Sequence, residues 1–303
     1  MIPKKYLIVI VGPTAIGKTA LSIALAKHFN SEILSADSRQ FFKEMAIGTA
    51  VPSSLELQEI PHHFIQHKNV KDTYNVGDFE RDVLQLLEEK FKQHDILFMV
   101  GGSGLYIKAV LDGMDYFPEV NPAIRTQLMI DLDEKGIHYL QEKLLRLDPH
   151  YYKKVDINNT HRLVRALEIC IGSGEAYSSF LGKKTENRDF LFLKIGLTTD
   201  RDFIYDRINK RVDQMMEGGL LEEVKELLPH KDLNALQTVG YRELFQFLNN
   251  DISLEEAIEE IKKNTRRYAK RQLTWFRKEE DIHWFDHPVN PEDVIAYIKS
   301  RTT

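Results

Sequence analysis

Residues 6–19 read YLIVIVGPTAIGKT, an apolar run that leads directly into a glycine loop. The first part, YLIVIV, is rich in β-branched side chains and predicts a parallel strand that is buried on both faces. The second part, GPTAIGKT, places two glycines five positions apart and ends in Lys18 and Thr19, the spacing of a phosphate-binding loop. Residues 18–29 continue with leucine and alanine at helical spacing. Strand, loop and helix therefore follow in the order that a phosphate-binding loop requires.

Each part of this loop has a chemical role in binding phosphate. The glycines let the backbone turn its amides toward phosphate oxygens, and the N-terminus of the following helix adds positive potential. Lys18 supplies a point charge, and the hydroxyl of Thr19 can ligate Mg²⁺. We expect the whole loop to bind a phosphate compound through Gly12, Pro13, Thr14, Ala15, Ile16, Gly17, Lys18 and Thr19.

The strand pattern recurs farther along the chain, with helical patterns such as residues 78–92 between the strands. This alternation predicts an α/β fold, here a P-loop NTPase-like parallel sheet flanked by helices. The further strands are expected at residues 32–36, 95–100, 190–197 and 282–285.

The region from about residue 118 has a different character, because helical patterns continue there without an apolar strand. We expect residues 118–189 to form a helical insertion domain. The catalytic core would then combine residues 1–117 with residues 190–303. Its C-terminal part should be mostly long charged helices, at residues 201–228, 237–249 and 253–278.

Composition limits the class of protein. The chain has 303 residues, of which 43% are apolar and 29% charged, with a net charge of −5, so any nucleic-acid contact must come from a local basic patch. A single cysteine, Cys170, rules out an internal disulfide and fits a reducing, cytoplasmic location. The apolar run at residues 6–11 is far too short to span a membrane, so no membrane association is expected.

Four polar residues, Asp37, Ser38, Arg39 and Gln40, follow the second expected strand. The carboxyl ends of parallel strands are where ligands bind in open α/β sheets, which favours a functional role beside the phosphate loop. Arg39 and Gln40 are planar donors suited to base edges and phosphates. The alternative is a turn aspartate with a solvated arginine.

The loop does not specify which phosphate compound it binds, since a nucleotide kinase or another NTPase would use the same pattern. Such enzymes usually carry a second strand that ends in aspartate. The strand near residues 96–100 ends in Gly101 and Gly102 instead, and no arginine-rich lid is evident. A triphosphate substrate is therefore disfavoured.

Residues 262–278, KKNTRRYAKRQLTWFRK, form a basic helix in which eight of seventeen residues are lysine or arginine. Aromatic residues interleave with the charges, a pattern that suits RNA because charge binds phosphates and flat rings stack on bases. An ordinary amphipathic helix whose aromatics pack inward is the alternative. The expected basic face comprises Lys263, Arg267, Lys270, Thr274 and Arg277, and the aromatics are Tyr268, Trp275 and Phe276.

Three smaller features of the sequence have a weaker link to function. Arg207 and Arg211 lie one helical turn apart and either clamp a diphosphate or form surface ion pairs. His62 and His63 lack the companions of a zinc site, which favours a structural or substrate-adjacent role. Ser103, in a glycine turn that opens a helix, would face the same cleft.

Several segments together resemble a known family. In chain order they are GPTAIGKT at 12–19, SADSRQ at 35–40, MAIGTA at 45–50, PHHFI at 61–65, VGGSGLY at 100–106, RLVRALEI at 162–169, RINKRVDQMMEGGLLEEVKEL at 207–227, VGYRE at 239–243 and TRRYAKRQLTWFR at 265–277. Their order and combination cover most of residues 6–280. By them the chain resembles the bacterial tRNA dimethylallyltransferase family.

The resemblance implies transfer of dimethylallyl from dimethylallyl diphosphate to N6 of the adenosine just 3′ of the anticodon, position 37 of tRNA, with Mg²⁺ as cofactor. It implies that Asp37 is the base, that residues 12–19 hold the diphosphate, and that the protein acts as a monomer on the anticodon stem-loop. The residues implied to face tRNA are Asp37, Ser38, Arg39, Gln40, Ser103, Arg125, His161, Arg162, Arg165, Gly240, Tyr241, Arg242, Lys270, Arg271, Gln272, Trp275 and Arg277.

The chain departs from the family pattern at a few positions. Ile16 replaces the usual serine of the loop, Ser103 replaces a more common threonine, and residues 156–161 read DINNTH where the family reads close to HPNDPQ. Three other functions stay open: an adenylate (AMP or ADP) isopentenyltransferase, a nucleotide kinase and a non-catalytic RNA-binding module. The long basic helix and the insertion favour a macromolecular acceptor over a mononucleotide.

Overall fold

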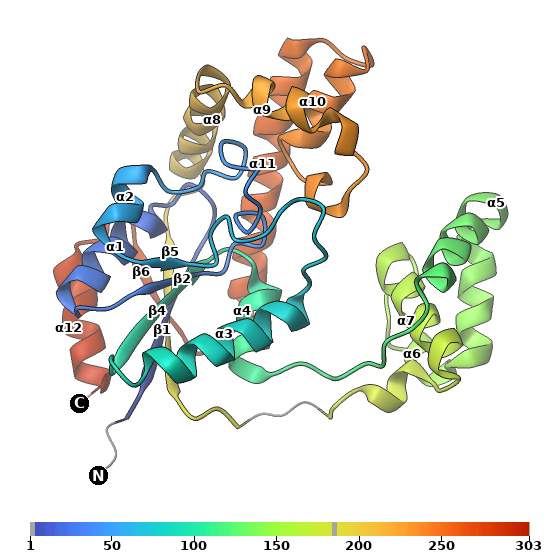
Figure 1. Cartoon of the computed structure of the whole chain (residues 1–303), viewed down its shortest axis with the longest axis horizontal. Helices are drawn as coiled ribbons and strands as arrows, with labels where there is room; N and C mark the ends of the chain where they lie inside the picture. The colour runs from blue at the N-terminus through green and yellow to red at the C-terminus, as the bar shows by residue number, and fades with distance from the viewer. Residues whose placement is uncertain (1–3, 184–186, 303) are drawn as a thin grey trace. The chain divides into compact units, whose positions relative to one another are not determined.

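A six-stranded parallel sheet forms the centre of the molecule's first unit (Figure 1). The computed structural model describes residues 4–183 and 187–302. The strands lie in the order β3-β2-β4-β1-β5-β6, and every pairing among them is parallel. Their bounds are β1 Tyr6–Val11, β2 Ile33–Ser35, β3 His62–His63, β4 Ile96–Gly101, β5 Leu191–Thr198 and β6 Ile282–Asp286. The expected parallel α/β sheet is confirmed, and the two-residue strand β3 is an addition to it.

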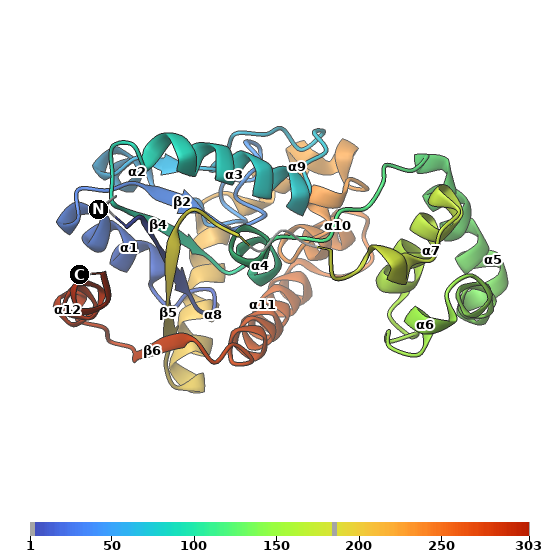
Figure 2. The same cartoon turned by 90° about the horizontal axis from the view of Figure 1, so that it is seen from below.

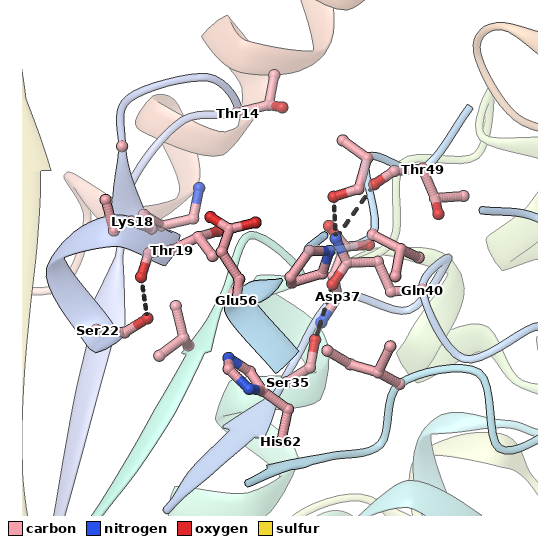
Figure 3. A pocket seen from close by; sticks show the side chains of 18 of the residues that line it. Thr14, Lys18, Thr19, Ser22, Ser35, Asp37, Gln40, Thr49, Glu56 and His62 are labelled. Carbon is pink, nitrogen blue, oxygen red and sulfur yellow. Dashed lines mark hydrogen bonds between the residues drawn. The ribbon is translucent and has the colours of Figure 1, made fainter. Parts of the chain in front are cut away.

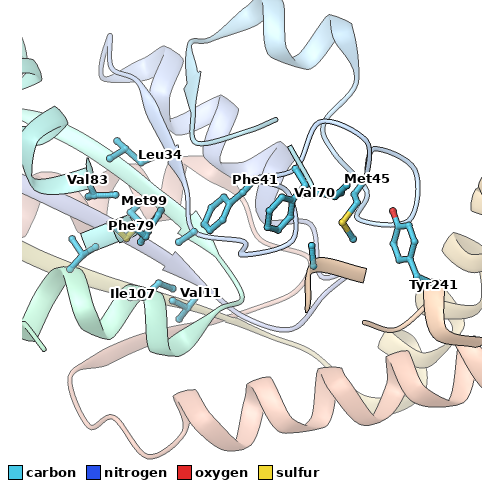
Figure 4. Close-up of a cluster of buried hydrophobic side chains, with 14 of the residues drawn as sticks. Val11, Leu34, Phe41, Met45, Val70, Phe79, Val83, Met99, Ile107 and Tyr241 are labelled. Atoms are coloured by element: carbon cyan, nitrogen blue, oxygen red, sulfur yellow. The ribbon is translucent and has the colours of Figure 1, made fainter. Parts of the chain in front are cut away.

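Strand β1 is buried along its whole length because helices cover both faces of the sheet (Figure 2). Alternate side chains of a strand point to opposite faces, and Leu7 and Val9 enter one core while Ile8 and Ile10 enter the other. The first core is drawn in Figure 4 and contains aromatic side chains such as Phe41 and Phe79. The uninterrupted apolar sequence of β1 follows from this double burial.

The helices of this unit fall on the two faces of the sheet. Side chains of α3 and α4 enter the first core, and those of α1, α8 and α12 enter the second. Their bounds are α1 Lys18–His28, α2 Ser54–Glu59, α3 Val76–Lys90, α4 Gly104–Asp112, α8 Arg201–Glu217, α9 Leu220–Leu227, α10 Tyr241–Leu248, α11 Leu254–Phe276 and α12 Pro291–Thr302, with short 3₁₀ turns at Leu228–His230 and Asn234–Leu236.

Glycines shorten two of the expected helices. The expected helix at residues 201–228 is divided into α8 and α9, since Gly219 has a φ of 97°, which the right-handed helix does not allow. The expected helix at residues 237–249 begins only at Tyr241, because Gly240 also has a φ of 97°. Helix α12, from Pro291, carries no motif and was not expected.

The second unit comprises Asp112–Asn187, and its described residues form helices joined by irregular chain. It contains α5 Pro122–Leu147, α6 Pro149–Tyr152, α7 Thr160–Ser173 and a 3₁₀ turn at Tyr177–Phe180, packed around leucines such as Leu140 and Leu163. Helix α5 is interrupted at Gly136, where φ is 74°. The expected bounds of the insertion, 118 and 189, differ from the observed 112 and 187 because residues 113–121, ahead of α5, are already irregular chain.

Over the described residues of both units, no helix combines the length and the apolar character needed to cross a membrane.

Candidate functional site

The phosphate loop connects β1 to α1 at the carboxyl edge of the sheet. Gly12 and Gly17 have φ values of 148° and 105°, and a Cβ on Gly12 would lie 2.8 Å from the carbonyl oxygen of Leu197. Both positions therefore need glycine. The ammonium of Lys18 donates to the carbonyl oxygens of Gly12 at 3.0 Å and Pro13 at 2.8 Å, so the lysine is folded back over its own loop.

A cavity of about 450 Å³, here called the loop cavity, opens beside this loop (Figure 3). Two arginines of α8 line it and also hold the loop. Arg207 donates through Nε to the carbonyl oxygen of Ala15 at 2.7 Å, and Arg211 donates through Nη1 to Oγ1 of Thr14 at 3.4 Å. The cavity is also lined by residues of the phosphate loop, of the chain from β2 to β3, and of α11, among them Gly17, Lys18, Thr19, Ser35, Asp37, Gln40, Thr49, Ala50, Glu56, His62 and Gln272.

Asp37 follows β2 and faces this cavity. Its Oδ1 accepts the backbone N–H of Arg39 at 3.1 Å, which fixes the carboxylate. Burial raises the pKa of Asp37 above its usual range, and the Arg39 N–H and the charge of Lys18 oppose that shift. Burial lowers the pKa of Lys18 to about 8, against the attraction of Asp37. The two groups therefore share one site of low dielectric, where their charges interact strongly.

A second cavity of about 400 Å³, here called the Tyr268 cavity, shares part of its wall with the loop cavity. Burial and the charge of Asp37 raise the pKa of Tyr268, so its phenol stays neutral. The two cavities have five lining residues in common: Thr14, Asp37, Thr49, Ala50 and Arg211. Among the residues that line only the Tyr268 cavity are Ser38, Arg39, Gly240, Arg242, Tyr268 and Arg271.

Gln40, expected to contact RNA, forms hydrogen bonds that stabilise the wall shared by the two cavities. Its Nε2 donates to the carbonyl oxygens of Thr49 at 3.1 Å and Ala50 at 3.0 Å, and its Oε1 accepts from Oγ of Ser35 at 3.1 Å. Its amide is thus satisfied within the protein, and its contact with RNA stays a prediction. Arg39 is also tied down through Nη1, which donates to the carbonyl oxygens of residues 234 and 235.

Tyr241, expected to face RNA, is corrected to a supporting residue. Its side chain is fully buried, and its hydroxyl donates to Oε1 of Glu223 at 2.6 Å. Glu223 also accepts the backbone N–H groups of residues 46, 47 and 48 at 2.7–3.0 Å. Tyr241 therefore stabilises the segment that leads into Thr49 and Ala50, and it has no surface to offer RNA.

Gln272, also expected to face RNA, is corrected in the same way, since only 5% of it is exposed. It bonds to the phosphate loop and to the end of β4 rather than facing solvent. Phe276 is also buried, in the first core, as the amphipathic alternative for this helix requires. The helix nevertheless keeps an exposed basic side, with Arg267, Lys270, Arg271, Thr274, Trp275 and Arg277 on it, whereas Lys263 is half-buried and pairs with Glu260.

Expected RNA contacts in the second unit lie on its surface. Arg125 and Arg165 both approach Oε2 of the buried Glu168, at 3.3 Å and 3.0 Å, and each remains nearly half exposed. His161 and Arg162 are exposed at the start of α7. In the first unit, Oγ of Ser103 accepts the backbone N–H of Ser38 at 3.0 Å, beside Asp37. The roles of these residues toward RNA stay predictions.

The loop cavity is also lined by Glu56, which was not predicted from the sequence, and by His62, for which the sequence leaves a structural or substrate-adjacent role open (Figure 3). Glu56 caps α2 by accepting the N–H of Ser53 at 2.8 Å, and the Ser53-x-x-Glu56 spacing is a readable capping box. His62 bonds through Nδ1 to the carbonyl oxygen of Ile60 at 2.8 Å, and its Nε2 has no hydrogen-bond partner in the described chain.

Comparison with known proteins finds similar chains over nearly the whole length of this one. A family model described as IPP transferase matches residues 40–279. A "tRNA dimethylallyltransferase" of Christiangramia forsetii is 60% identical over 296 residues, or 98% of each chain. The crystal structure of a tRNA isopentenylpyrophosphate transferase from Bacillus halodurans is 37% identical, with a TM-score of 0.74 over 99% of this chain and 97% of that one. A eukaryotic dimethylallyltransferase solved acting on tRNA is 29% identical, with a TM-score of 0.77 over 93% and 74% of the two chains.

The fold and the loop define a P-loop-like α/β enzyme with a helical insertion. More particularly, the chain belongs to the IPP transferase family, a family of prenyl-transferring enzymes.

Proposed function

We propose that this protein transfers the dimethylallyl group of dimethylallyl diphosphate to N6 of the adenosine on the 3′ side of the anticodon, position 37 of tRNA. The observation that carries the proposal is that Asp37 lies in the wall shared by two cavities. One cavity is lined by a phosphate loop and the other by tyrosine and arginine side chains. Two substrates can thus meet at one carboxylate.

The loop cavity suits the diphosphate end of the prenyl donor. As the C–O bond to the diphosphate breaks, negative charge grows on the leaving group, and fixed cations there lower the barrier. Lys18, Arg207 and Arg211 supply that charge from one side of the cavity. Holding donor and acceptor in line adds a further rate advantage.

Asp37 suits the role of general base. The N6 lone pair is delocalised into the adenine ring, so N6 becomes a useful nucleophile only as it loses a proton. The new C–N bond forms at the allylic carbon while Asp37 accepts the N6 proton and diphosphate departs. Because burial raises the pKa of Asp37, its carboxylate is a stronger base than one in water.

The cavity also fits Mg²⁺, which prefers oxygen ligands and commonly joins diphosphate to protein. Thr19 and Glu56 both line the cavity and offer a hydroxyl and a carboxylate (Figure 3). A carboxylate beside an anion site is unfavourable unless a cation lies between them. When bound, Mg²⁺ would neutralise charge on the leaving diphosphate.

The Tyr268 cavity suits an unstacked purine base. RNA enzymes of this kind act on loop bases that can leave the stack and lie against aromatic and arginine side chains. Since the chain is acidic overall, RNA needs a local basic surface, and the exposed basic side of α11 offers one in the first unit. We propose that the enzyme works on the anticodon stem-loop as a cytoplasmic monomer.

The test is a product assay with Mg²⁺, dimethylallyl diphosphate and an anticodon stem-loop RNA, with AMP and ADP as parallel acceptors. Mass spectrometry should find one prenyl unit on the RNA and none on the mononucleotides. A stem-loop RNA with guanosine in place of the target adenosine, which offers no N6 amine, is the matched control and should stay unmodified. Transfer to AMP or ADP alone would assign the chain to adenylate prenylation, and ATP turnover without prenyl donor would assign it to a kinase.

A further inference from the structure

One buried side chain connects the basic helix α11 to the phosphate loop. Oε1 of Gln272 accepts the backbone N–H of Thr14 at 2.8 Å, and Nε2 donates to the carbonyl oxygen of Gly102 at 3.1 Å. A Cβ on Gly102 would lie 1.9 Å from that Nε2, so any side chain at this position would displace the Gln272 amide. Three segments that are far apart in sequence therefore converge on one amide.

The same helix also forms the wall of the other cavity. Tyr268 lies one turn before Gln272 on the same side of α11, and it lines the Tyr268 cavity together with Arg271. Gln272 lines the loop cavity. Successive turns of one rigid helix thus reach both proposed substrate sites, while Lys270 and Arg277 remain exposed.

Close packing makes this connection stiff. A Cβ on Gly104 would lie 2.2 Å from Nε1 of Trp275, which shows that the start of α4 lies directly against α11. Thr14 is held from two sides, at its amide by Gln272 and at its hydroxyl by Arg211. Because the Gln272 amide is buried and hydrogen-bonded at both ends, a displacement of α11 would be transmitted through it to the phosphate loop.

We propose that Gln272 is a positioning residue that couples RNA binding on α11 to diphosphate binding in the phosphate loop. RNA would restrict α11 to one position, and the Gln272–Thr14 hydrogen bond would then restrict the loop to its binding conformation, so diphosphate binds more tightly. The coupling must be reciprocal, because the two ligands share one thermodynamic cycle. The inference rests on the proposed function and adds an energetic link between its two sites.

The test measures binding rather than turnover. Inorganic diphosphate with Mg²⁺ is titrated calorimetrically into the full-length protein, with and without saturating anticodon stem-loop RNA. We expect RNA to lower the diphosphate Kd by about fivefold or more. In Gln272→Met, which keeps the volume and loses both hydrogen bonds, we expect that factor to fall within about twofold of unity.

Two further variants separate coupling from damage to the fold. Gln246→Met makes the same chemical change at an exposed position of α10 and should keep the wild-type coupling. Gly102→Ala keeps Gln272 itself but places a methyl group against its side-chain amide, which must then move. This variant should also lose the coupling, and it can be measured even if Gln272→Met fails to fold. The inference is overturned if wild type shows no coupling, or if the folded Gln272→Met and Gly102→Ala variants retain it. Binding of both ligands without prenyl transfer would instead refute the proposed function, and failure of either ligand to bind wild type would refute both.

Discussion

The two cavities that meet at Asp37 are built in different ways. One continuous stretch of chain, residues 14–19, supplies much of the loop cavity, and cations of α8 complete it. The Tyr268 cavity is assembled from several separate segments: residues 37–39, 48–50 and 237–240, and side chains of α8, α10 and α11. Charge can be bound by fixed backbone geometry, whereas a base needs flat and polar side chains brought together by tertiary packing.

Asp37 provides the sharpest test of this division, because it belongs to both cavities. In Asp37→Asn the amide oxygen can still accept the Arg39 N–H, so the local geometry is kept while the base is lost. We expect kcat to fall by about 10²–10⁴, the usual contribution of a general base. RNA affinity, measured by fluorescence anisotropy, should change little. Equal losses of turnover and RNA affinity would show that Asp37 holds the RNA instead.

The alkaline side of the pH profile tests the loop cavity by itself, because Lys18 lines only that cavity. As pH rises through about 8, free Lys18 loses its proton, so kcat/KM for the prenyl donor should fall by about tenfold per pH unit above that point. As pH falls through the raised pKa of Asp37, its carboxylate is protonated and activity should fall again. Lys18→Arg keeps its charge at alkaline pH and should lose the alkaline decline. An unchanged decline in Lys18→Arg would assign it to another group.

Substitutions on the exposed side of α11 test the proposed RNA-binding surface, and the expected change in RNA affinity is smaller. Lys270→Ala and Arg277→Ala should each weaken stem-loop binding and make log Kd less dependent on log salt concentration by about 0.7 for each lost phosphate contact. Diphosphate affinity without RNA should not change. Lys92→Ala, an exposed lysine outside α11, is the matched control and should keep the wild-type slope. Wild-type slopes in both α11 variants would place the RNA elsewhere.

The loop cavity could largely be predicted from the sequence, because a phosphate loop is local. Its strand, glycines and following helix lie within about twenty-five residues, and Asp37 follows from the rule that ligands bind at the carboxyl ends of parallel strands. Glu56 and His62 could not be placed, since only the tertiary fold brings α2 and β3 to the loop.

The Tyr268 cavity could be predicted only in part, since family motifs give residues without their burial. VGYRE contains both the buried Tyr241 and the half-exposed Arg242, and RRYAKRQLTWFR contains both the exposed Lys270 and the buried Gln272. In each motif, a residue that supports the site therefore lies close in sequence to a residue that can contact its ligand. Which residue does which depends on the helix face that packs inward, and that face is decided by distant segments.

The neighbours Tyr241 and Arg242 give the finest test of that distinction. Tyr241→Phe removes one hydrogen bond to the carboxylate of Glu223, so we expect a loss of about 1.5–3 kcal/mol in the free energy of unfolding. Calorimetry should then record a Tm lower by about 2–4 °C per kcal/mol, with RNA affinity nearly unchanged. Arg242→Ala should instead weaken RNA binding and leave Tm nearly unchanged. Its ion pair with Glu243 is long, at 3.9 Å, and Arg242 is half exposed, so the pair adds little stability, whereas the side chain lines the Tyr268 cavity. If Tyr241→Phe instead weakened RNA binding at an unchanged Tm, the buried tyrosine would be part of the acceptor site after all, and the separation between supporting and contacting residues would fail at this motif.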